Sequence, residues 1–469
     1  METNAFIHLI TSPLGFYFYD VNKNDIVEIG ENLYRYLANG KVSENAEKEF
    51  LEFRECGYLE DFYPEVIEDG RIDSLPYYLN NKLEQLTLQV TQGCNFRCSY
   101  CSYSQENSLN RKHSAKHMSY ETAKQAVDFF AERTKDSGHL NISFYGGEPL
   151  LEYDLIIQII KYIQTRLEGR EVSYNITTNA TLLTPPKLDT LLKNNVNVLV
   201  SFDGNRENHN RGRKFAKNGY GTFDAVMAAL KRIKDQTPEN YEKLSFNCVI
   251  DPLSDYSKTK EIFESDMFNQ SDILTPILEP CTGTLTVLSE EFDWQYRTEM
   301  FLALLAFQGV IDFCELGALA RNYLSYIQTY TKRMEFSYTI SKKMGRGGPC
   351  YSGVKDLFVN VDGNLYPCEK VSEESDVACI GNLYTGFNID NIKNQINIGN
   401  LTEDRCKRCW AISQCTICIK QADAGKFIAG DLIKRQCKNV LSTCENNIKT
   451  FIALKETSKE ITRILSGVV

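Results

Sequence analysis

The chain has 469 residues, 42% apolar residues and a net charge of −10. This length predicts two to four domains. The acidic balance argues against a nucleic-acid partner, because phosphate contacts need a basic face. No apolar run approaches the roughly 18 residues of a membrane helix, and no basic signal-peptide segment opens the chain, so we expect a soluble cytoplasmic protein with no membrane partner.

The 16 cysteines are strongly clustered. A reducing compartment disfavours structural disulfides, so clustered cysteines predict metal binding. Three lie in residues 94–101 and nine in residues 350–444. His113 and His117 are four residues apart, but no strong helix pattern surrounds them. Four cysteines are isolated, and we interpret them as small buried apolar residues: Cys56, Cys248, Cys281 and Cys314.

The first 80 residues begin with three short strands and two helices. In order, these are predicted at 6–10, 15–20, 25–29, 31–39 and 43–55. Their order and length resemble the winged-helix recognition element that binds leader peptides in ribosomal peptide maturation. A small sheet with an open edge can accept a peptide as an added strand. The alternative is a small packing appendage, and residues 62–82 are interpreted as a linker.

Three cysteines follow the next predicted strand, at 86–90. Cys94, Cys98 and Cys101 have the spacing CxxxCxxC. Thiolates are the usual ligands of iron–sulfur clusters, and three thiolates on a four-iron cluster would leave one iron open to a small molecule. The alternatives are three buried cysteines or a zinc site.

Strands and helices then alternate, which predicts a parallel α/β fold. Ser119 and Thr184 stand at predicted helix caps, and Pro185 opens the helix after Thr184. The predicted strands are 86–90, 140–145, 172–177, 196–200, 244–250 and 273–278. Helices between them are predicted at about 120–135, 154–167, from 185 onward, and 222–235.

Polar and glycine-rich motifs end three of these strands. The second strand runs into Gly146-Gly147-Glu148-Pro149, the third into Thr178-Asn179 and the fourth into Ser201-Phe202-Asp203-Gly204. Glycines permit a tight turn close to a ligand. In barrels the site lies at the C-terminal strand ends, so these motifs are predicted to meet the cysteine loop. The alternatives are an Asx-turn at Asp203 and a solvated loop arginine at Arg211.

Residues 285–349 carry apolar residues at helical intervals and are predicted to cover the open side of the barrel. The glycine-rich stretch Gly345–Pro349 ends this pattern, and Cys350 follows it. Asp362-Gly363 predicts a hairpin turn before Cys368. The remaining cysteines of the pattern are Cys406, Cys409, Cys415, Cys418 and Cys437. Their paired CxxC units alone would suggest zinc.

The CxxxCxxC loop and the motifs at the strand ends resemble the radical SAM enzymes. The resemblance implies a partial (β/α)6 TIM barrel and a [4Fe–4S] cluster on Cys94, Cys98 and Cys101 whose open iron binds S-adenosyl-L-methionine. It also implies a 5′-deoxyadenosyl radical that removes a hydrogen from the substrate. Asp203 is then the catalytic candidate, beside the cofactor or the substrate. The implied cofactor contacts are Tyr100, Gly146, Gly147, Glu148, Pro149, Thr178, Asn179, Ser201 and Arg211.

The C-terminal cysteines resemble the SPASM subgroup, whose members mostly modify peptides and proteins. That resemblance implies two auxiliary [4Fe–4S] clusters, one on Cys350, Cys368 and Cys418, the other on Cys406, Cys409, Cys415 and Cys437. The subgroup usually has three residues between the last two cysteines of the central run, whereas Thr416 and Ile417 are only two. Two clusters want eight ligands and the pattern gives seven. Either the first auxiliary cluster has an open iron that a substrate cysteine could fill, or Cys379 or Cys444 completes it.

These resemblances predict an enzyme that forms Cys thioether cross-links in a ribosomally made precursor peptide. Its leader would bind the N-terminal domain, and a flavodoxin or ferredoxin would donate electrons. Alternatives are formylglycine formation of the anaerobic sulfatase-maturase kind, another radical modification such as carbon–carbon cross-linking, or a zinc-stabilised scaffold without chemistry. The predicted domains are 1–82 for leader recognition, 83–284 for the barrel, 285–349 as a helical bridge, 350–455 for the SPASM region, and 456–469 as a tail.

Overall fold

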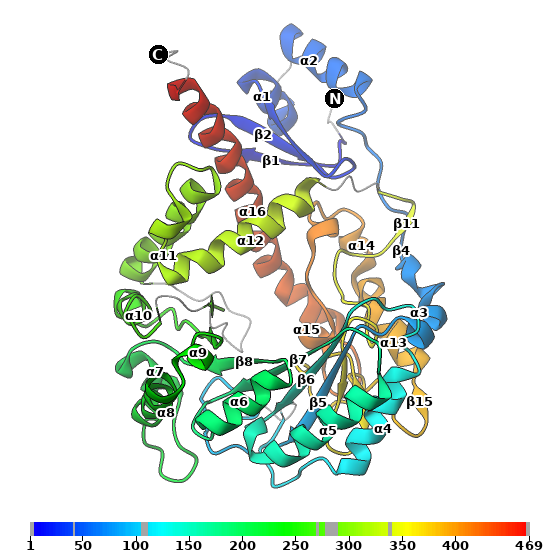
Figure 1. Ribbon diagram of the computed structural model, residues 1–469. Coiled ribbons are helices and arrows are strands. Elements are labelled where there is room, and N and C mark those ends of the chain that lie inside the picture. Colours follow the sequence, from blue (N-terminus) through cyan, green and yellow to red (C-terminus); the bar gives the residue numbers. More distant parts are fainter. Residues whose placement is uncertain are drawn as a thin grey trace.

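The computed structural model describes residues 4–40, 43–104, 111–268, 272–276, 289–335 and 340–465. Figure 1 shows a small sheet with two helices at the top, a larger sheet flanked by helices at the bottom, and an irregular region on the right. The long helix α16 (Gly430–Leu465) runs from that region back to the small sheet. Within the described ranges, no helix combines the length and apolar character needed to span a bilayer.

The N-terminal region is a three-stranded antiparallel sheet with two helices, at the predicted positions. Phe18 of the central strand lies opposite Leu9 and Val27, and it is fully buried against the helices. The Ser43 side chain caps the second helix by accepting from the amide of Ala46. The elements are β1 (Ile7–Thr11), β2 (Phe16–Asp20), β3 (Asp25–Ile29), α1 (Glu31–Asn39) and α2 (Glu44–Glu55).

This small sheet is anchored to the C-terminal region. Tyr17 and Tyr19 belong to an apolar cluster with residues of α16, and Tyr17 donates to Glu456 on that helix at 2.8 Å. The ring of His8 stacks on Trp410, with ring centroids 3.9 Å apart. The N-terminal region is therefore held directly on the part of the chain that carries the last cysteines.

Six parallel strands with intervening helices form the predicted α/β core. Leu86, Leu88 and Val90 alternate along the first strand and pack with Ile159 and Ile163 of a covering helix. The strands are β5 (Gln85–Thr91), β6 (Leu140–Gly146), β7 (Val172–Thr178), β8 (Val196–Ser201), β9 (Ser245–Asn247) and β10 (Ile273–Leu274). The helices are α4 (Tyr120–Ala131), α5 (Tyr153–Arg166), α6 (Pro185–Lys193), α7 (Arg206–Gly212), α8 (Phe223–Gln236), α9 (Pro238–Tyr241) and α10 (Tyr256–Phe263).

The last two strands of this core are shorter than predicted. The amides of Cys248 and Ile250 still bond the carbonyls of Leu274 and Pro276, so the backbone pairing continues beyond β9 without regular strand geometry. The end of the predicted sixth strand, residues 277–278, lies outside the described residues, as does Cys281.

The C-terminal region extends the same sheet instead of forming a separate one. Strand β12 (Leu357–Val359) pairs in parallel with β5, and the sheet order is β10-β9-β8-β7-β6-β5-β12-β13-β14-β15. Asp362-Gly363 makes the predicted turn into β13 (Asn364–Tyr366), and Gly363 has a φ of +82° that suits glycine. The remaining elements are β14 (Gly381–Asn382), β15 (Gly386–Phe387), α13 (Ile389–Ile396), α14 (Glu403–Cys406) and α15 (Ile419–Ala422).

The predicted helical bridge consists of α11 (Glu290–Phe307) and α12 (Ala318–Glu335). Asn322 of α12 donates to Thr275 beside β10 at 2.7 Å, and Lys260 of α10 pairs with the buried Glu299 of α11 at 2.6 Å. The two helices therefore pack at the β10 end of the sheet, on the left of Figure 1.

Three expectations need correction. The stretch interpreted as a linker contains β4 (Val66–Ile67), paired with β11 (Lys343–Met344), and the helix α3 (Leu75–Asn81), whose leucines lie in the main core. The residues expected to form a tail continue α16 as far as Leu465, because apolar residues recur along it at helical intervals. Of the isolated cysteines, Cys248 is buried as expected, but Cys56 and Cys314 are exposed and do not fill a core.

Candidate functional site

The CxxxCxxC loop follows the end of β5 and brings its three thiols together. Cys94, Cys98 and Cys101 are half-buried, and each of the latter two raises the pKa of the Cys94 thiol through its charge. A strap formed by residues 212–216 covers the loop, with the amide of Ser99 bonded to the carbonyl of Gly212 at 2.9 Å. Backbone hydrogen bonds to residues 212–216 therefore cover and hold the cysteine loop.

Burial is the main influence on these thiols. It raises the pKa of Cys94 to about 12 and of Cys98 to about 11, and it raises the pKa of Cys101. Thiols in such surroundings stay protonated at neutral pH unless a cation compensates the thiolate charge. Binding of a metal centre here would release protons and stabilise the fold.

The two glycines after β6 are required by the approach of the cysteine loop. A side chain on Gly147 would place its Cβ 2.2 Å from the carbonyl oxygen of Gly93 and 2.8 Å from Cβ of Cys94. Gly146 has a φ of +152°, and a Cβ there would meet the Thr91 carbonyl oxygen at 2.2 Å. Only glycine fits both positions, as the motif predicts.

Glu148 joins the ends of two strands. Its buried carboxylate accepts from the Thr178 hydroxyl at 2.7 Å and from the Asn179 amide at 2.8 Å, and it caps the turn at Leu150. Asn179 in turn donates to Asn95, inside the cysteine loop, at 2.8 Å. Burial raises the pKa of Glu148, and these hydrogen bonds oppose that shift. The three predicted residues form one polar chain that ends beside Cys94; their cofactor contacts stay predictions.

Asp203, the predicted catalytic residue, is the centre of a buried ion pair. Its carboxylate lies 2.8 Å from Nε and 3.2 Å from Nη2 of Arg213, and it accepts from the hydroxyl of Tyr100 and the amide of Val249. Arg213 also reaches Sγ of Cys98, 4.0 Å away. Asp203 thus positions an arginine and a tyrosine beside a cysteine ligand, while Ser201, just before it, is 9% exposed.

Two arginines follow this motif. The sequence singled out Arg211, whereas the structure buries Arg213 beside Asp203. Arg211 is exposed, 3.4 Å from Asp251 and bonded to the carbonyl of Leu253, so the structure pairs it away from the thiols. Its contact with the methionine carboxylate stays a prediction. Arg213, which the sequence did not single out, is the buried arginine of the site. Spacing alone could not distinguish them, because Arg211 lies in the last turn of α7 and Arg213 is the residue just after that helix.

His209 holds the loop that contains Asp203 in place through hydrogen bonds. Its Nδ1 accepts from the amide of Asp203 at 3.2 Å, and its Nε2 lies 3.1 Å from the Thr222 hydroxyl. Burial, with the Arg213 charge as a second cause, lowers the pKa of His209 to about 3. The ring is therefore neutral and structural, another contribution that the sequence did not reveal.

The C-terminal cysteines form two groups. In the first group, Cys418 raises the pKa of Cys368, and Cys350 raises that of Cys418. In the second group, burial and then the charges of Cys406 and Cys415 raise the pKa of both Cys409 and Cys437. The two auxiliary ligand sets implied by the SPASM resemblance stay predictions.

Cys444 lies beside the second cysteine group, which already has four members. Its pKa is raised by burial and then by Cys415 and Cys409, and its Sγ lies 3.7 Å from the carbonyl oxygen of Gln414. Cys379 lies 3.3 Å from the carbonyl of Gly381. Of the two candidates for an eighth ligand, Cys444 therefore lies beside the four-cysteine group and not beside the three-cysteine group, which lacks a ligand.

Across the ranges described above, no three histidine, cysteine or acidic side chains converge as ligands of one metal ion. In a [4Fe–4S] cluster each thiolate binds a different iron, so its ligands stand further apart. His113, whose ring bonds Ser104 and the Gln92 backbone, does not join His117 in a metal site.

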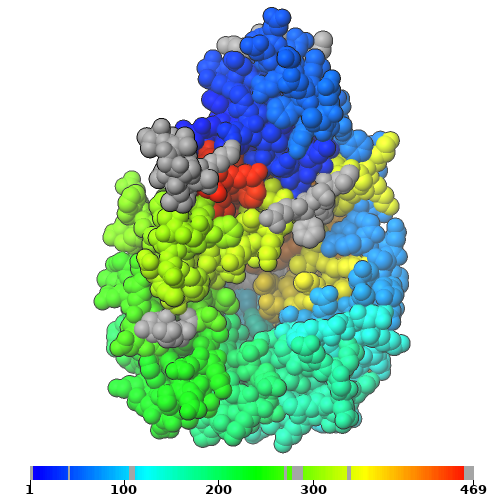
Figure 2. Space-filling view, turned by 45° about the horizontal axis from the view of Figure 1, so that its top comes forward, coloured from blue at the N-terminus to red at the C-terminus, as the bar shows by residue number. Residues whose placement is uncertain are grey.

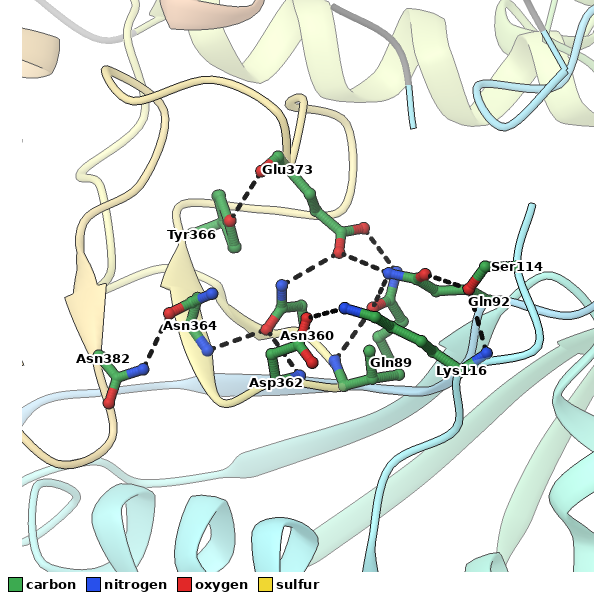
Figure 3. Close-up of polar contacts among 11 residues, drawn as sticks. Gln89, Gln92, Ser114, Lys116, Asn360, Asp362, Asn364, Tyr366, Glu373 and Asn382 are labelled. Carbon is green, nitrogen blue, oxygen red and sulfur yellow. Dashed lines mark hydrogen bonds and ion pairs between the residues drawn. The ribbon is translucent and has the colours of Figure 1, made fainter. Parts of the chain in front are cut away.

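A polar network joins the first cysteine loop to the C-terminal region (Figure 3). Glu373 accepts from Gln89 of β5 at 2.5 Å, from Gln92 at 3.3 Å and from Asn360 at 3.2 Å. Gln92 is two residues before Cys94, so the network connects the loop directly to the hairpin after β12. Lys116 adds an ion pair to that hairpin, 2.8 Å from Asp362.

The same glutamate faces a buried arginine. Nε of Arg111 lies 2.9 Å from Oε1 of Glu373, but the N–H is not aimed at the oxygen, so charge rather than a hydrogen bond joins them. The guanidinium lies over the ring of Phe358 at 4.6 Å and near Tyr145 at the end of β6. A cation–π contact suits a desolvated guanidinium. Figure 2 shows a hollow that opens toward this part of the molecule, with gold atoms of the C-terminal region on its floor.

The fold and the thiol loop define a class: a parallel α/β sheet with a three-cysteine loop after the first strand of its core. Residues 88–262 match the model of the Radical SAM superfamily. The cysteine-type anaerobic sulfatase-maturating enzyme of Clostridium novyi is 24% identical over 390 residues, covering 79% of this chain and 97% of that protein. The radical SAM cyclopropyl synthase TigE of Paramaledivibacter caminithermalis is 26% identical over 255 residues, 52% of this chain and about half (51%) of that protein.

A solved structure has the same fold. Native anSMEcpe with bound AdoMet and Kp18Cys peptide gives a TM-score of 0.55 at 20% identity, covering 80% of this chain and 99% of that one. Residues 88–262 are therefore similar to the Radical SAM superfamily, and most of the chain is similar to an anaerobic sulfatase-maturating enzyme. That superfamily uses a [4Fe–4S] cluster and S-adenosylmethionine, and the buried thiol loop fits such a cluster.

Proposed function

We propose that this protein is a radical SAM enzyme that forms thioether cross-links in a cysteine-containing, ribosomally made peptide. One observation carries the proposal: Glu373, five residues after Cys368, accepts a hydrogen bond from Gln92, two residues before Cys94. One polar network therefore joins the two thiol sites, although Cys368 itself follows the antiparallel β13 and lies toward the start of β5. A hydrogen abstraction followed by removal of one electron needs two such sites close together.

When bound at Cys94, Cys98 and Cys101, the cluster and S-adenosylmethionine would supply the 5′-deoxyadenosyl radical that takes a hydrogen from the substrate. The chain's own residues would position that chemistry. Asp203 would act through Arg213 and Tyr100, which it holds beside Cys98. We therefore assign Asp203 a positioning role instead of direct contact with the reacting atoms.

The first cysteine group would bind the substrate thiolate. The resemblance gives it three cysteines. Cys444 lies beside the second group instead, and Cys379, which packs in the same apolar cluster as Cys368, is the remaining rival for a fourth ligand. A cluster held by three thiolates has an iron free for a fourth, soft ligand. This supports the alternative of an open iron at Cys350, Cys368 and Cys418.

The N-terminal sheet would hold the leader of the precursor peptide. It is small and antiparallel, and among the described residues its outer strands β1 and β3 pair only with β2, which leaves edges for strand addition. Its contacts with α16 and Trp410 fix it beside the second cysteine group, so a bound leader would be tethered to the enzyme core. A flavodoxin or ferredoxin is the electron donor that this chemistry implies.

Formylglycine formation is the second candidate, favoured by the match to almost the full length of the Clostridium novyi enzyme. Mass spectrometry separates the two. Reduced, reconstituted enzyme would be incubated with S-adenosylmethionine and either the Kp18Cys peptide or short cysteine-containing precursor peptides encoded near the gene. A thioether removes the mass of two hydrogen atoms and keeps the sulfur, whereas formylglycine loses two hydrogen atoms and also has oxygen in place of the sulfur. Loss of sulfur from Kp18Cys, with no change in any precursor, would overturn the thioether proposal.

A further inference from the structure

The glycine-rich stretch before Cys350 holds a buried arginine against the second cysteine group. Arg346 is 6% exposed. Its Nη1 lies 3.6 Å from Sγ of Cys415, within hydrogen-bonding distance for sulfur, and its Nη2 donates to the carbonyl of Ile417 at 3.3 Å. The guanidinium thus binds both the sulfur and the backbone of the loop that carries the ligand.

The surrounding glycines are required by this contact. A Cβ on Gly347 would lie 1.9 Å from the carbonyl oxygen of Ser413, and one on Gly348 would lie 2.9 Å from that of Cys415. Across the site, a Cβ on Gly399 would meet Nε of Arg346 at 3.2 Å. The sequence pattern of Gly345–Pro349 predicts only a boundary, but in the fold this stretch holds Arg346 against the loop that carries Cys415.

The charge of Arg346 has no carboxylate partner in the part of the chain that the structure describes, and its buried Nε has no hydrogen-bond acceptor there. A lone buried charge is costly unless an opposite charge compensates it. The groups it does face are the sulfur of Cys415 and, through its field, Cys437. Neutral thiols cannot compensate a guanidinium, but thiolates bound to a cluster can.

We propose that Arg346 tunes the second cysteine group to accept an electron. This rests on the proposed function in one respect, that the group holds an iron–sulfur cluster. Uptake of one electron lowers the net charge of the centre by one, and the adjacent cation stabilises that reduced form. No bond at Arg346 forms or breaks, and the guanidinium keeps its protons. Hydrogen bonds to sulfur and nearby charge are established influences on cluster potentials.

The test is an anoxic redox titration with dithionite, followed by electron paramagnetic resonance. The full chain carries Cys94, Cys98 and Cys101→Ala, so that only the C-terminal centres contribute signals. In this background Arg346→Gln removes the charge, and Arg346→Lys keeps the charge but cannot make both contacts. Arg333→Gln is the control, because exposed Arg333 donates to the neighbouring Ser413 carbonyl at 3.1 Å and makes no hydrogen bond to sulfur within the described ranges.

We expect Arg346→Gln to lower the reduced-to-oxidised ratio of one centre at least tenfold at a fixed potential, about 59 mV for one electron. Arg346→Lys should shift the same centre less, and Arg333→Gln should shift neither. Unchanged potentials in both Arg346 variants would overturn the proposal. If Arg346→Gln does not retain iron, Arg346→Lys decides alone, and a wild-type potential would then refute the inference. A background protein without iron at the C-terminal cysteines would instead refute the auxiliary-cluster part of the proposed function.

Discussion

The cysteine loop after β5 and the C-terminal cysteine region each bury an arginine beside a cysteine. The charge of the arginine is compensated differently in the two regions. In the barrel, Arg213 lies near Cys98 and is paired with Asp203 at 2.8 Å. In the C-terminal region, Arg346 lies near Cys415 and has no such carboxylate among the described residues. The barrel site is therefore compensated by protein groups alone, whereas the second cysteine group needs an anionic centre. The comparison indicates that metal binding and folding are coupled more tightly in the C-terminal region.

Removing the barrel ligands should have the largest effect. In Cys94/Cys98/Cys101→Ala, production of 5′-deoxyadenosine should cease, and iron should fall from about 12 to about 8 per chain, by the stoichiometry of four-iron clusters. Chromatography and iron analysis after anoxic reconstitution measure both. Cys248→Ala, which removes a buried isolated cysteine, is the control. Deoxyadenosine formation in the triple variant would show that the loop is not the radical centre.

Removing all iron should lower the local stability of the C-terminal cysteine region more than that of the α/β core. Amide hydrogen exchange is expected to rise by at least tenfold around residues 345–349 and 403–437, where Arg346 loses its counter-charge, because local opening there becomes easier. Strands β6 and β7, far from any such charge, should keep their protection. Equal loosening of both regions in the iron-free protein would remove the distinction drawn between Arg213 and Arg346.

Breaking the barrel pair should cost several kcal/mol. Asp203→Asn leaves Arg213 buried without its counter-charge, which typically destabilises by about 3–5 kcal/mol. Asp251→Asn removes the partner of exposed Arg211 and should cost at most about 1 kcal/mol. Urea unfolding of the two variants measures the difference. Similar midpoints for both would mean that the Asp203 pair contributes no more than a surface pair.

The pH dependence should show a smaller effect from His209. Its pKa is about 3 in the fold and about 6.5 when unfolded, so the unfolded chain binds the proton first. The stability from the neutral ring is complete above pH 6.5 and is lost as the pH falls toward 3. Between pH 6.5 and 5 the loss should be roughly 2 kcal/mol.

His209→Gln removes this titration without removing a hydrogen-bonding side chain. Urea unfolding at pH 7 and pH 5 should therefore show a steeper loss in the wild type than in the variant. Parallel losses in the two proteins would contradict a buried neutral His209.

The sequence predicts the barrel well because its signals are local. Gly146 and Gly147 mark a strand end, and the structure shows why only glycine fits there. The strands of the N-terminal sheet and the hairpin at Asp362-Gly363 also occur where predicted, since turns and alternation are read over a few residues. The grouping of the C-terminal cysteines followed from a family resemblance, which local patterns could not supply.

The missed features all depend on long-range packing. Arg213 and Arg211 differ in burial and not in any local signal, and Arg111 meets Glu373 from 262 positions away in the chain. Arg346 was hidden in a stretch that looked like a boundary, because its glycines serve a contact with residues 413–417. Partners this distant in sequence cannot be inferred from one chain without the fold.

The central claim is that the two cysteine regions have different roles. The loop with Cys94, Cys98 and Cys101 generates the radical, and the C-terminal groups complete the product. The most direct test is the ratio of modified peptide to 5′-deoxyadenosine in the wild type and in a Cys406/Cys409/Cys437→Ala variant. We predict that the variant still forms 5′-deoxyadenosine while the ratio falls at least tenfold. An unchanged ratio would contradict the account, because the second cysteine group would then have no part in the reaction.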